Sequence, residues 1–186
     1  MKKRILSLAI SAALVLTMLP AGALAAGDKG TPPVYNKATG CYEISTPAQL
    51  LYLSGSWKDG TPRDGHYVLT ADIDMSGVKG FKPIASKKEQ GFIGTFDGQF
   101  HAIKGLRVEY EKKYAGLFGY VGNQDDQAYI KDVALLDCYV TGQQNVGALA
   151  GVNYGTITGC VVTGEVKCLD LSNSHTAGGI CGKLKE

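Results

Sequence analysis

The carboxylates with the most suggestive spacing are Asp72 and Asp74, which lie two residues apart in a segment of alternating polarity. Residues at positions i and i+2 of a strand lie on one face, so these two side chains could together bind a calcium ion. A calcium loop of the EF-hand type does not follow, because Gly77 takes its sixth position but Pro83 stands where that loop needs glutamate. We therefore interpret both carboxylates as solvated groups on the outer face of a strand and predict no metal site.

A second acidic pair, Asp125-Asp126, lies in the polar stretch 122–127 between two apolar segments. This composition is typical of a surface loop. The pair could contact a ligand, but nothing around it in the sequence requires one, so we expect a solvated loop.

The histidines His66, His101 and His175 are far apart and show none of the short spacings of metal ligands. The sequence has no His-Glu-x-x-His motif of a zinc peptidase and no local motif around a serine or cysteine nucleophile. Gly116 and Gly119 lie inside an apolar segment, so they do not indicate a phosphate-binding loop. We therefore predict no catalytic residues and no cofactor, and hence a protein that is not an enzyme.

The five cysteines are irregularly spaced and odd in number, which is not typical of a disulfide-stabilised scaffold. They are Cys41, Cys138, Cys160, Cys168 and Cys181. We expect at least one free thiol. In the repeats described below, Cys160 aligns with Leu106 and Val133, and Cys181 aligns with Phe118 and Ala150. We therefore predict that both cysteines act as small core side chains.

Tyrosines stand near the edges of several apolar segments, at Tyr110, Tyr114, Tyr120, Tyr129, Tyr139 and Tyr154. A row of exposed rings on a flat face could stack on sugars or dock a protein. The same rings could instead fill and cover the core. Their position, inside or outside the fold, separates these two hypotheses.

The first 25 residues have the three parts of a secretory signal peptide: Lys2-Lys3-Arg4, an uncharged apolar run over 5–19, and small residues over 21–25. The apolar run is too short for a membrane span, and Pro20 interrupts it. We predict cleavage near Ala26, a secreted or cell-surface location and no later membrane span. Cleavage would remove three basic residues and no acidic one, leaving 16 against 17, a net charge of −1. This balance argues against nucleic acid as a partner.

Beyond the signal peptide we expect a flexible polar leader over 26–40 and one domain over 41–186. The domain begins with a short strand over 41–44 and a helix over 47–53. Thr46 can cap the free amides of this helix, and Pro47 fits its first position because it lacks an N–H.

Two further segments show the pattern of strands. The strict alternation over 65–75 predicts one half-buried strand. A strand, a turn and a second strand are expected over 92–103, because Asp97-Gly98 is a tight-turn dipeptide.

Two repeated patterns indicate stacked coils. An apolar triplet recurs every 27 residues, as Ile103-x-x-Leu106-x-Val108, Ile130-x-x-Val133-x-Leu135 and Ile157-x-x-Cys160-x-Val162. A glycine-framed apolar pair recurs as Gly116-Leu117-Phe118-Gly119, Gly147-Ala148-Leu149-Ala150-Gly151 and Gly178-Gly179-Ile180-Cys181-Gly182. Such coils cannot close a core alone, but stacked coils bury equivalent side chains in columns. We predict an all-β fold, a right-handed parallel β-helix with a short N-terminal capping helix, in which Ile103, Ile130 and Ile157 form one column.

The glycine-framed motifs resemble the GLUG-motif repeats of bacterial exported and cell-surface proteins. The first motif, at Gly116, Leu117, Phe118 and Gly119, matches outright. The second, at Gly147, Leu149 and Gly151, and the third, at Gly178, Ile180 and Gly182, match with one inserted small residue, and the third has Ile180 in place of leucine. The segments 42–50, 69–77 and 94–103 also resemble the lead-in of such proteins. The resemblance implies a β-helix, whereas its functional meaning is broad, because such modules accompany adhesins, immunoglobulin-A-cleaving metallopeptidases and other proteins.

We therefore expect a non-catalytic exported or cell-surface β-solenoid module that acts in adhesion or in presenting a neighbouring domain. Two alternatives stay open: a carbohydrate-binding or carbohydrate-cleaving β-helix, and the N-terminal module of a larger secreted peptidase. The expected partners are a host or cell-surface protein or a glycan. The 27-residue spacing places another strand at Leu184, where no polar cap follows. We thus also expect truncation, or self-association through an uncapped C-terminal edge.

Overall fold

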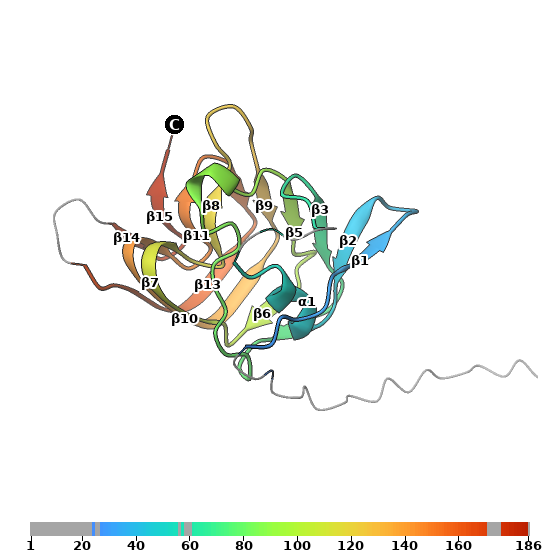
Figure 1. The fold of residues 1–186 in the computed structure, drawn as a ribbon, viewed down its shortest axis with the longest axis horizontal. Coiled ribbons are helices and arrows are strands. Elements are labelled where there is room, and N and C mark those ends of the chain that lie inside the picture. Colours follow the sequence, from blue (N-terminus) through green and yellow to red (C-terminus); the bar gives the residue numbers. More distant parts are fainter. Residues whose placement is uncertain (1–23, 25–26, 56, 58–60, 171–175, 186) are drawn as a thin grey trace, which may run out of the picture.

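Three β-sheets wind around a common core and form a parallel β-solenoid (Figure 1). The computed structural model describes residues 24, 27–55, 57, 61–170 and 176–185. Apart from Leu24, the predicted signal peptide, residues 1–25, lies outside the described residues. Within them, helix is limited to α1 (Pro47–Tyr52) and the 3₁₀ turn η1 (Lys88–Gln90). The predicted all-β parallel β-helix with a short N-terminal helix is confirmed.

Successive coils contribute strands to the three sheets. Sheet A contains β1 (Val34–Asn36), β2 (Cys41–Ile44), β3 (His66–Leu69), β5 (Thr95–Asp97), β9 (Tyr129–Lys131) and β12 (Thr156–Thr158). Sheet C contains β4 (Ile73–Asp74), β6 (Ala102–Lys104), β7 (Arg107–Ala115), β10 (Ala134–Gly147), β13 (Val161–Cys168) and β14 (Ala177–Gly178). Sheet B contains β8 (Phe118–Val121), β11 (Ala150–Asn153) and β15 (Cys181–Leu184). Among the described strands, only β1 and β2 pair antiparallel, so the leader predicted over 26–40 includes a paired strand.

Equivalent side chains stack in columns inside the coils. On sheet A, Phe96 is in register with Ile130, and Ile130 with Ile157. On sheet B, Ala150 is in register with both Phe118 and Cys181, as the glycine-framed motifs predicted. Such columns bury apolar area that a single coil would leave exposed.

The predicted column of Ile103, Ile130 and Ile157 is wrong. Ile103 lies on sheet C, in register with Ile73 and Leu135, whereas Ile130 and Ile157 lie on sheet A. The coils differ in length: 34 residues separate Phe96 from Ile130, but 27 separate Ile130 from Ile157. Much of the difference is the loop 122–128, which the next coil replaces with residues 154–155. The first 27-residue interval therefore joins residues of different sheets, and Leu106 is not an equivalent of Val133 and Cys160.

The segment 65–75 does not form the single strand that its alternation predicted. It forms β3 and β4, and the chain turns from sheet A to sheet C over residues 70–72. Tyr67, Leu69, Ile73 and Met75 are nevertheless all buried. The alternation could not show the corner, because the inward and outward orientation of the side chains continues through it.

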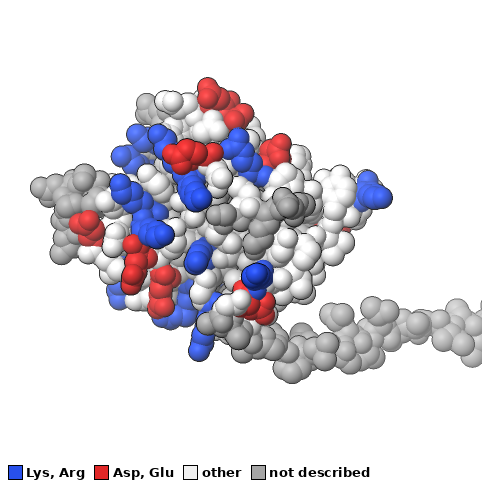
Figure 2. All heavy atoms as spheres, in the orientation of Figure 1, with Lys and Arg blue, Asp and Glu red and all other residues white. Residues whose placement is uncertain are grey.

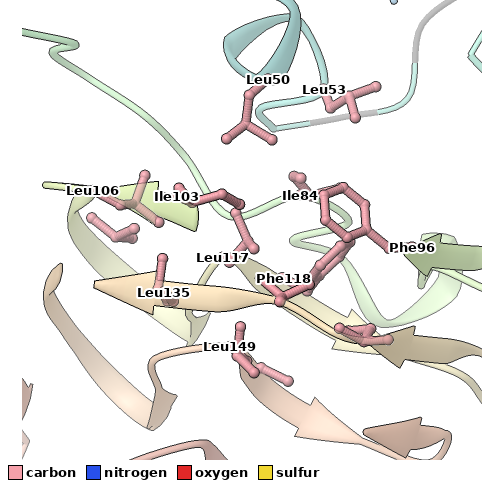
Figure 3. Close-up of a cluster of buried hydrophobic side chains, with 14 of the residues drawn as sticks. Leu50, Leu53, Ile84, Phe96, Ile103, Leu106, Leu117, Phe118, Leu135 and Leu149 are labelled. Carbon is pink, nitrogen blue, oxygen red and sulfur yellow. The ribbon is translucent and has the colours of Figure 1, made fainter. Parts of the chain in front are cut away.

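Helix α1 covers the end of the core formed by the first coil. Thr46 Oγ1 accepts a hydrogen bond from Gln49 N at 3.3 Å, and Gln49 Oε1 accepts one from Thr46 N at 3.1 Å, which is a capping box. Leu50 and Leu53 are buried and extend from the helical segment toward the side chains of the coils (Figure 3). The predicted capped helix is confirmed. Neither helix of the described residues is long and apolar enough to cross a membrane.

Candidate functional site

In the later coils, sheet C continues beyond β6 as an arm, before the chain turns into sheet B. The arm consists of β7, the second half of β10, and β13 (Figure 1). Fifteen residues separate Ile103 on sheet C from Phe118 on sheet B, but only eleven separate their register partners Ile73 and Ile84. The coil before β7 is therefore too short to add a strand to the arm. Among the described residues, β7 pairs with β10 on one side and with no strand on the other.

The main chain of β7 offers hydrogen-bonding groups along this free edge. Tyr139 is in register with Arg107, and Tyr139 N donates to Leu106 O at 2.8 Å. In a parallel ladder, alternate residues bond toward the same neighbour, so the next to bond toward β10 is Val108. The N–H and C=O groups of Arg107 and Glu109 therefore point away from β10, toward the free edge.

A groove of about 900 Å³ lies beside this edge. It is lined by Ser54, Gly55, Lys82, Ser86, Lys87, Glu109, Tyr110, Glu111, Lys112, Tyr139, Thr141 and Leu169. A smaller hollow of about 360 Å³ adjoins it, because Lys82, Glu109 and Tyr110 line both. We call these two hollows together the β7 groove.

The charged side chains of the β7 groove are mainly basic. They are Lys79, Lys82, Lys87, Arg107 and Lys112 against Glu109 and Glu111. Arg107 forms an ion pair with Glu109 at 3.0 Å, but none of the four lysines forms an ion pair with another described residue. Basic and acidic side chains are intermingled on the face that Figure 2 shows. The five basic and two acidic side chains that line the β7 groove give it a net charge of +3, whereas the whole chain has a net charge of +2.

Tyr139 lies on β10, the middle strand of the arm, between β7 and β13. The guanidinium carbon of Arg107 lies 4.5 Å from the ring centroid, and the Lys167 ammonium nitrogen lies 5.4 Å from it. Lys167 also lies 2.7 Å from Glu165, and its hydrogen bond to that carboxylate raises the pKa of the ammonium. Cation–π contacts of this kind fix the ring and occupy its faces.

Sequence reasoning missed this groove. Its lysines and glutamates are scattered from Lys79 to Lys112, and no motif joins them. The one related feature of the sequence is that Ile73 and Ile84 are four residues closer than Ile103 and Phe118. These two pairs can be compared only when the register of the strands is known.

The carboxylates Asp72 and Asp74 are exposed and have local partners. Asp72 Oδ1 accepts a hydrogen bond from Ala102 N at 3.0 Å and lies 3.3 Å from His101 Nδ1. The hydrogen bond from Ala102 lowers the pKa of Asp72, and the hydrogen bonds of Ser76 lower that of Asp74. Of the described residues, no group of three potential ligands could hold a metal ion.

The other candidate polar residues are not brought together. His66 is exposed on β3, and His175 lies outside the described residues. Asp125 and Asp126 form a local turn, since both of their main-chain amides donate to Asn123 Oδ1. The expected solvated loop is therefore present at this position.

All five cysteines are free thiols. Cys160 and Cys181 are half-buried and pack against the core, while Cys138 is fully buried, a role the sequence analysis did not assign. Burial raises the pKa of all three of these thiols. Their environment is that of small core side chains.

The six candidate tyrosines do not form one exposed row. Tyr120 is buried, with its ring centroid 5.3 Å from that of Tyr114 and 5.6 Å from that of Tyr154. Tyr129 is 48% exposed on sheet A. Tyr110 and Tyr139 are half-buried and line the β7 groove. The rings therefore serve both to cover the core and to line a surface groove.

The last coil presents an open apolar edge. Within the described chain, the outer edges of β12, β13 and β15 pair with no strand. Leu117 and Leu149 are buried, but Ile180, which follows them in the same column, is 43% exposed, and Leu184 is 74% exposed. A groove of about 730 Å³ lies here, lined in part by Ile157, Cys160 and Cys181.

Sequence comparison relates the chain to parts of longer proteins. Halomucin from Haloquadratum walsbyi is 32% identical over 132 residues, which cover 67% of this chain and 1% of halomucin. A "Putative Gly-rich membrane protein" from Evansella cellulosilytica is 32% identical over 125 residues, which cover 62% of this chain and 14% of that protein. The chain thus spans only a small part of either relative. No protein-family model matches it, so its resemblance to GLUG repeats stays a prediction.

Comparison with solved structures gives a "putative immunoglobulin A1 protease" from Bacteroides ovatus. Its sequence is 18% identical, and the superposition has a TM-score of 0.43. The match covers 85% of this chain and 64% of the other.

Proposed function

We propose that this chain is a non-catalytic β-solenoid module of an exported or cell-surface protein, and that it mediates adhesion by binding another molecule in the β7 groove. The observation that carries the proposal is the edge of β7 that pairs with no strand among the described residues. It combines free main-chain groups with lysines that lack ion-pair partners in the described chain. Strand edges of this kind are normally covered or paired, because they otherwise bind other chains.

The two sequence relatives support a module at a cell surface. Each contains the matching region as a small part of a much longer chain. One is named halomucin and the other is named as a membrane protein. A solenoid unit of this size suits such a position, because stacked coils present extended surfaces for binding.

The test is adhesion of beads that display the purified secreted chain to an envelope preparation of the producing cells and to immobilised extracellular matrix. We expect binding to at least one surface, and at least a severalfold loss for the double variant Lys82→Ser/Lys87→Ser. The double variant Lys37→Ser/Lys183→Ser is the matched control, since both lysines are exposed outside the β7 groove. Equal adhesion of both double variants would contradict the proposal.

Carbohydrate binding is the second candidate function. The β7 groove places the rings of Tyr110 and Tyr139 near the carboxylates Glu109 and Glu111, a mixture found in sugar-binding sites. This function predicts that a glycan array retains the protein and that Tyr110→Ala releases it. The third possibility, a module of a larger secreted peptidase, stays a hypothesis.

A further inference from the structure

We infer that β7 binds an acidic polypeptide segment in extended conformation, which adds to the arm as a new strand. This inference rests on the proposed function and names the ligand class for the same groove. Strand addition needs a free edge whose main-chain groups point outward, and side-chain pockets beside it. The β7 groove meets both requirements.

The free edge is long enough for such a ligand. β7 contains nine residues, and a strand rises about 3.3 Å per residue, so the edge extends over about 30 Å. The outward groups of Arg107 and Glu109 lie in its first half, where the ladder with β10 is regular. An added strand could bond to these two residues without breaking any bond between β7 and β10.

Charge favours an acidic ligand. Glu109 is already paired with Arg107, which leaves Lys79, Lys82, Lys87 and Lys112 facing a single unpaired carboxylate, that of Glu111. These lysines come from the loop before η1 and from β7 itself, so they lie on elements that flank an added strand. Acidic side chains of the ligand would find cationic partners there.

The geometry favours a polypeptide over a glycan. Sugar recognition would depend on uncovered aromatic faces, but Arg107 and Lys167 both lie against the ring of Tyr139, which leaves only the Tyr110 ring of the groove for stacking on a sugar. A sugar also lacks the repeating N–H and C=O groups that match the outward groups of Arg107 and Glu109. Only a polypeptide satisfies an entire strand edge.

The experiment measures fluorescence polarisation of a labelled (Thr-Glu)₅ peptide with the secreted chain. The matched probe is (Thr-Lys)₅, which should bind at least about tenfold more weakly. Glu109→Pro removes an outward N–H that takes no part in the ladder with β10, whereas Glu109→Ala keeps that N–H. We expect more than about tenfold weaker binding of (Thr-Glu)₅ to Glu109→Pro, and unchanged or tighter binding to Glu109→Ala.

Hydrogen exchange provides a second test that needs no variant. In the unaltered chain, (Thr-Glu)₅ should slow exchange of the Arg107 and Glu109 amides. The inference is overturned if (Thr-Glu)₅ does not bind, if both Glu109 variants bind it equally, or if these amides gain no protection. Retention of polygalacturonate in place of the peptide would also overturn it. If groove-dependent bead adhesion persists in any of these cases, the proposed function stands and only the ligand class is wrong.

Discussion

The framing glycines of the repeated motif lie where backbones pass too closely for a side chain. A Cβ atom at Gly147 would meet the carbonyl oxygen of Ala150 and the amide nitrogen of Gly182. At the equivalent Gly178 it would meet the carbonyl oxygen of Cys181. The motif is therefore a packing requirement at the junction of the arm and sheet B, and this explains why glycine returns at Gly116, Gly147 and Gly178 in the three coils that form the arm.

Replacement of Gly147 by alanine should destabilise the protein by roughly 1–3 kcal/mol, the usual cost of overpacking. The neighbouring motif residue Gly179 is the matched control, because nothing lies within 4 Å of a Cβ atom placed there. We expect Gly179→Ala to change the free energy of unfolding by less than about 0.5 kcal/mol. Urea denaturation of both variants measures the difference, and equal effects would contradict this role of Gly147.

The raised pKa values of the buried thiols predict slow alkylation. Burial raises the pKa of Cys138, Cys160 and Cys181, so each has less reactive thiolate at neutral pH than an ordinary cysteine. The thiolate fraction, and hence the rate, should increase as the pH is raised through the ordinary range and above it. Iodoacetamide labelling followed by peptide mass spectrometry should find Cys138 slowest, because it is the most buried. Rapid labelling of Cys138 at neutral pH would show that this strand opens readily.

Some residue positions could be predicted from the sequence and others could not. Cys181 was matched correctly with Phe118 and Ala150, because the adjacent glycines mark the same corner in these three coils. Ile103 was mismatched with Ile130, because spacing alone does not tell which sheet a residue belongs to when loops differ in length.

At the scale of elements, α1 has a role that the sequence made visible. Its capping box is local, and its leucines cover one end of the core. Replacement of Thr46 by alanine should cost about 1 kcal/mol in the free energy of unfolding, since Gln49 N loses the Thr46 Oγ1 acceptor. Thr39→Ala, at an exposed turn, is the control and should be nearly neutral. Thermal denaturation that finds equal stability for both variants would contradict the capping role.

A purified protein that consists of residues 27–186 should self-associate through the described edges of β12, β13 and β15. Its free strand edges and the exposed Ile180 and Leu184 can pair with a second copy. Sedimentation velocity over a range of protein concentrations should show dimers, and Ile180→Lys/Leu184→Lys should remove them. Val34→Lys, an exposed strand position on β1, should leave them intact. Dimers that persist in the double variant would exclude this edge.

The edge of β7 illustrates the limit of prediction at this scale. The candidate residues considered from the sequence were clustered acids, histidines and tyrosines, whereas the groove arises from a missing piece of strand. The coil before β7 lacks this piece of strand, because Ile73 and Ile84 are four residues closer in the sequence than their register partners Ile103 and Phe118. A repeat count that assumes equal coils cannot show it.

For the whole molecule, these features describe a module whose first coil is covered by a helix and whose side carries one groove. Helix α1 covers the first coil, the last coil exposes strand edges, and the arm presents β7. The chain matches small parts of two longer relatives. In this account, binding depends on the free edge of β7.

The most direct test of that central claim is residue-resolved amide hydrogen exchange of the free protein. Val108 N–H bonds toward β10 and should exchange slowly, whereas the outward amides of Arg107 and Glu109 should exchange more than about tenfold faster. Alternation of slow and fast amides along β7 would establish the free edge. Uniformly slow exchange of all three amides would show that this edge is already paired, and would contradict the account.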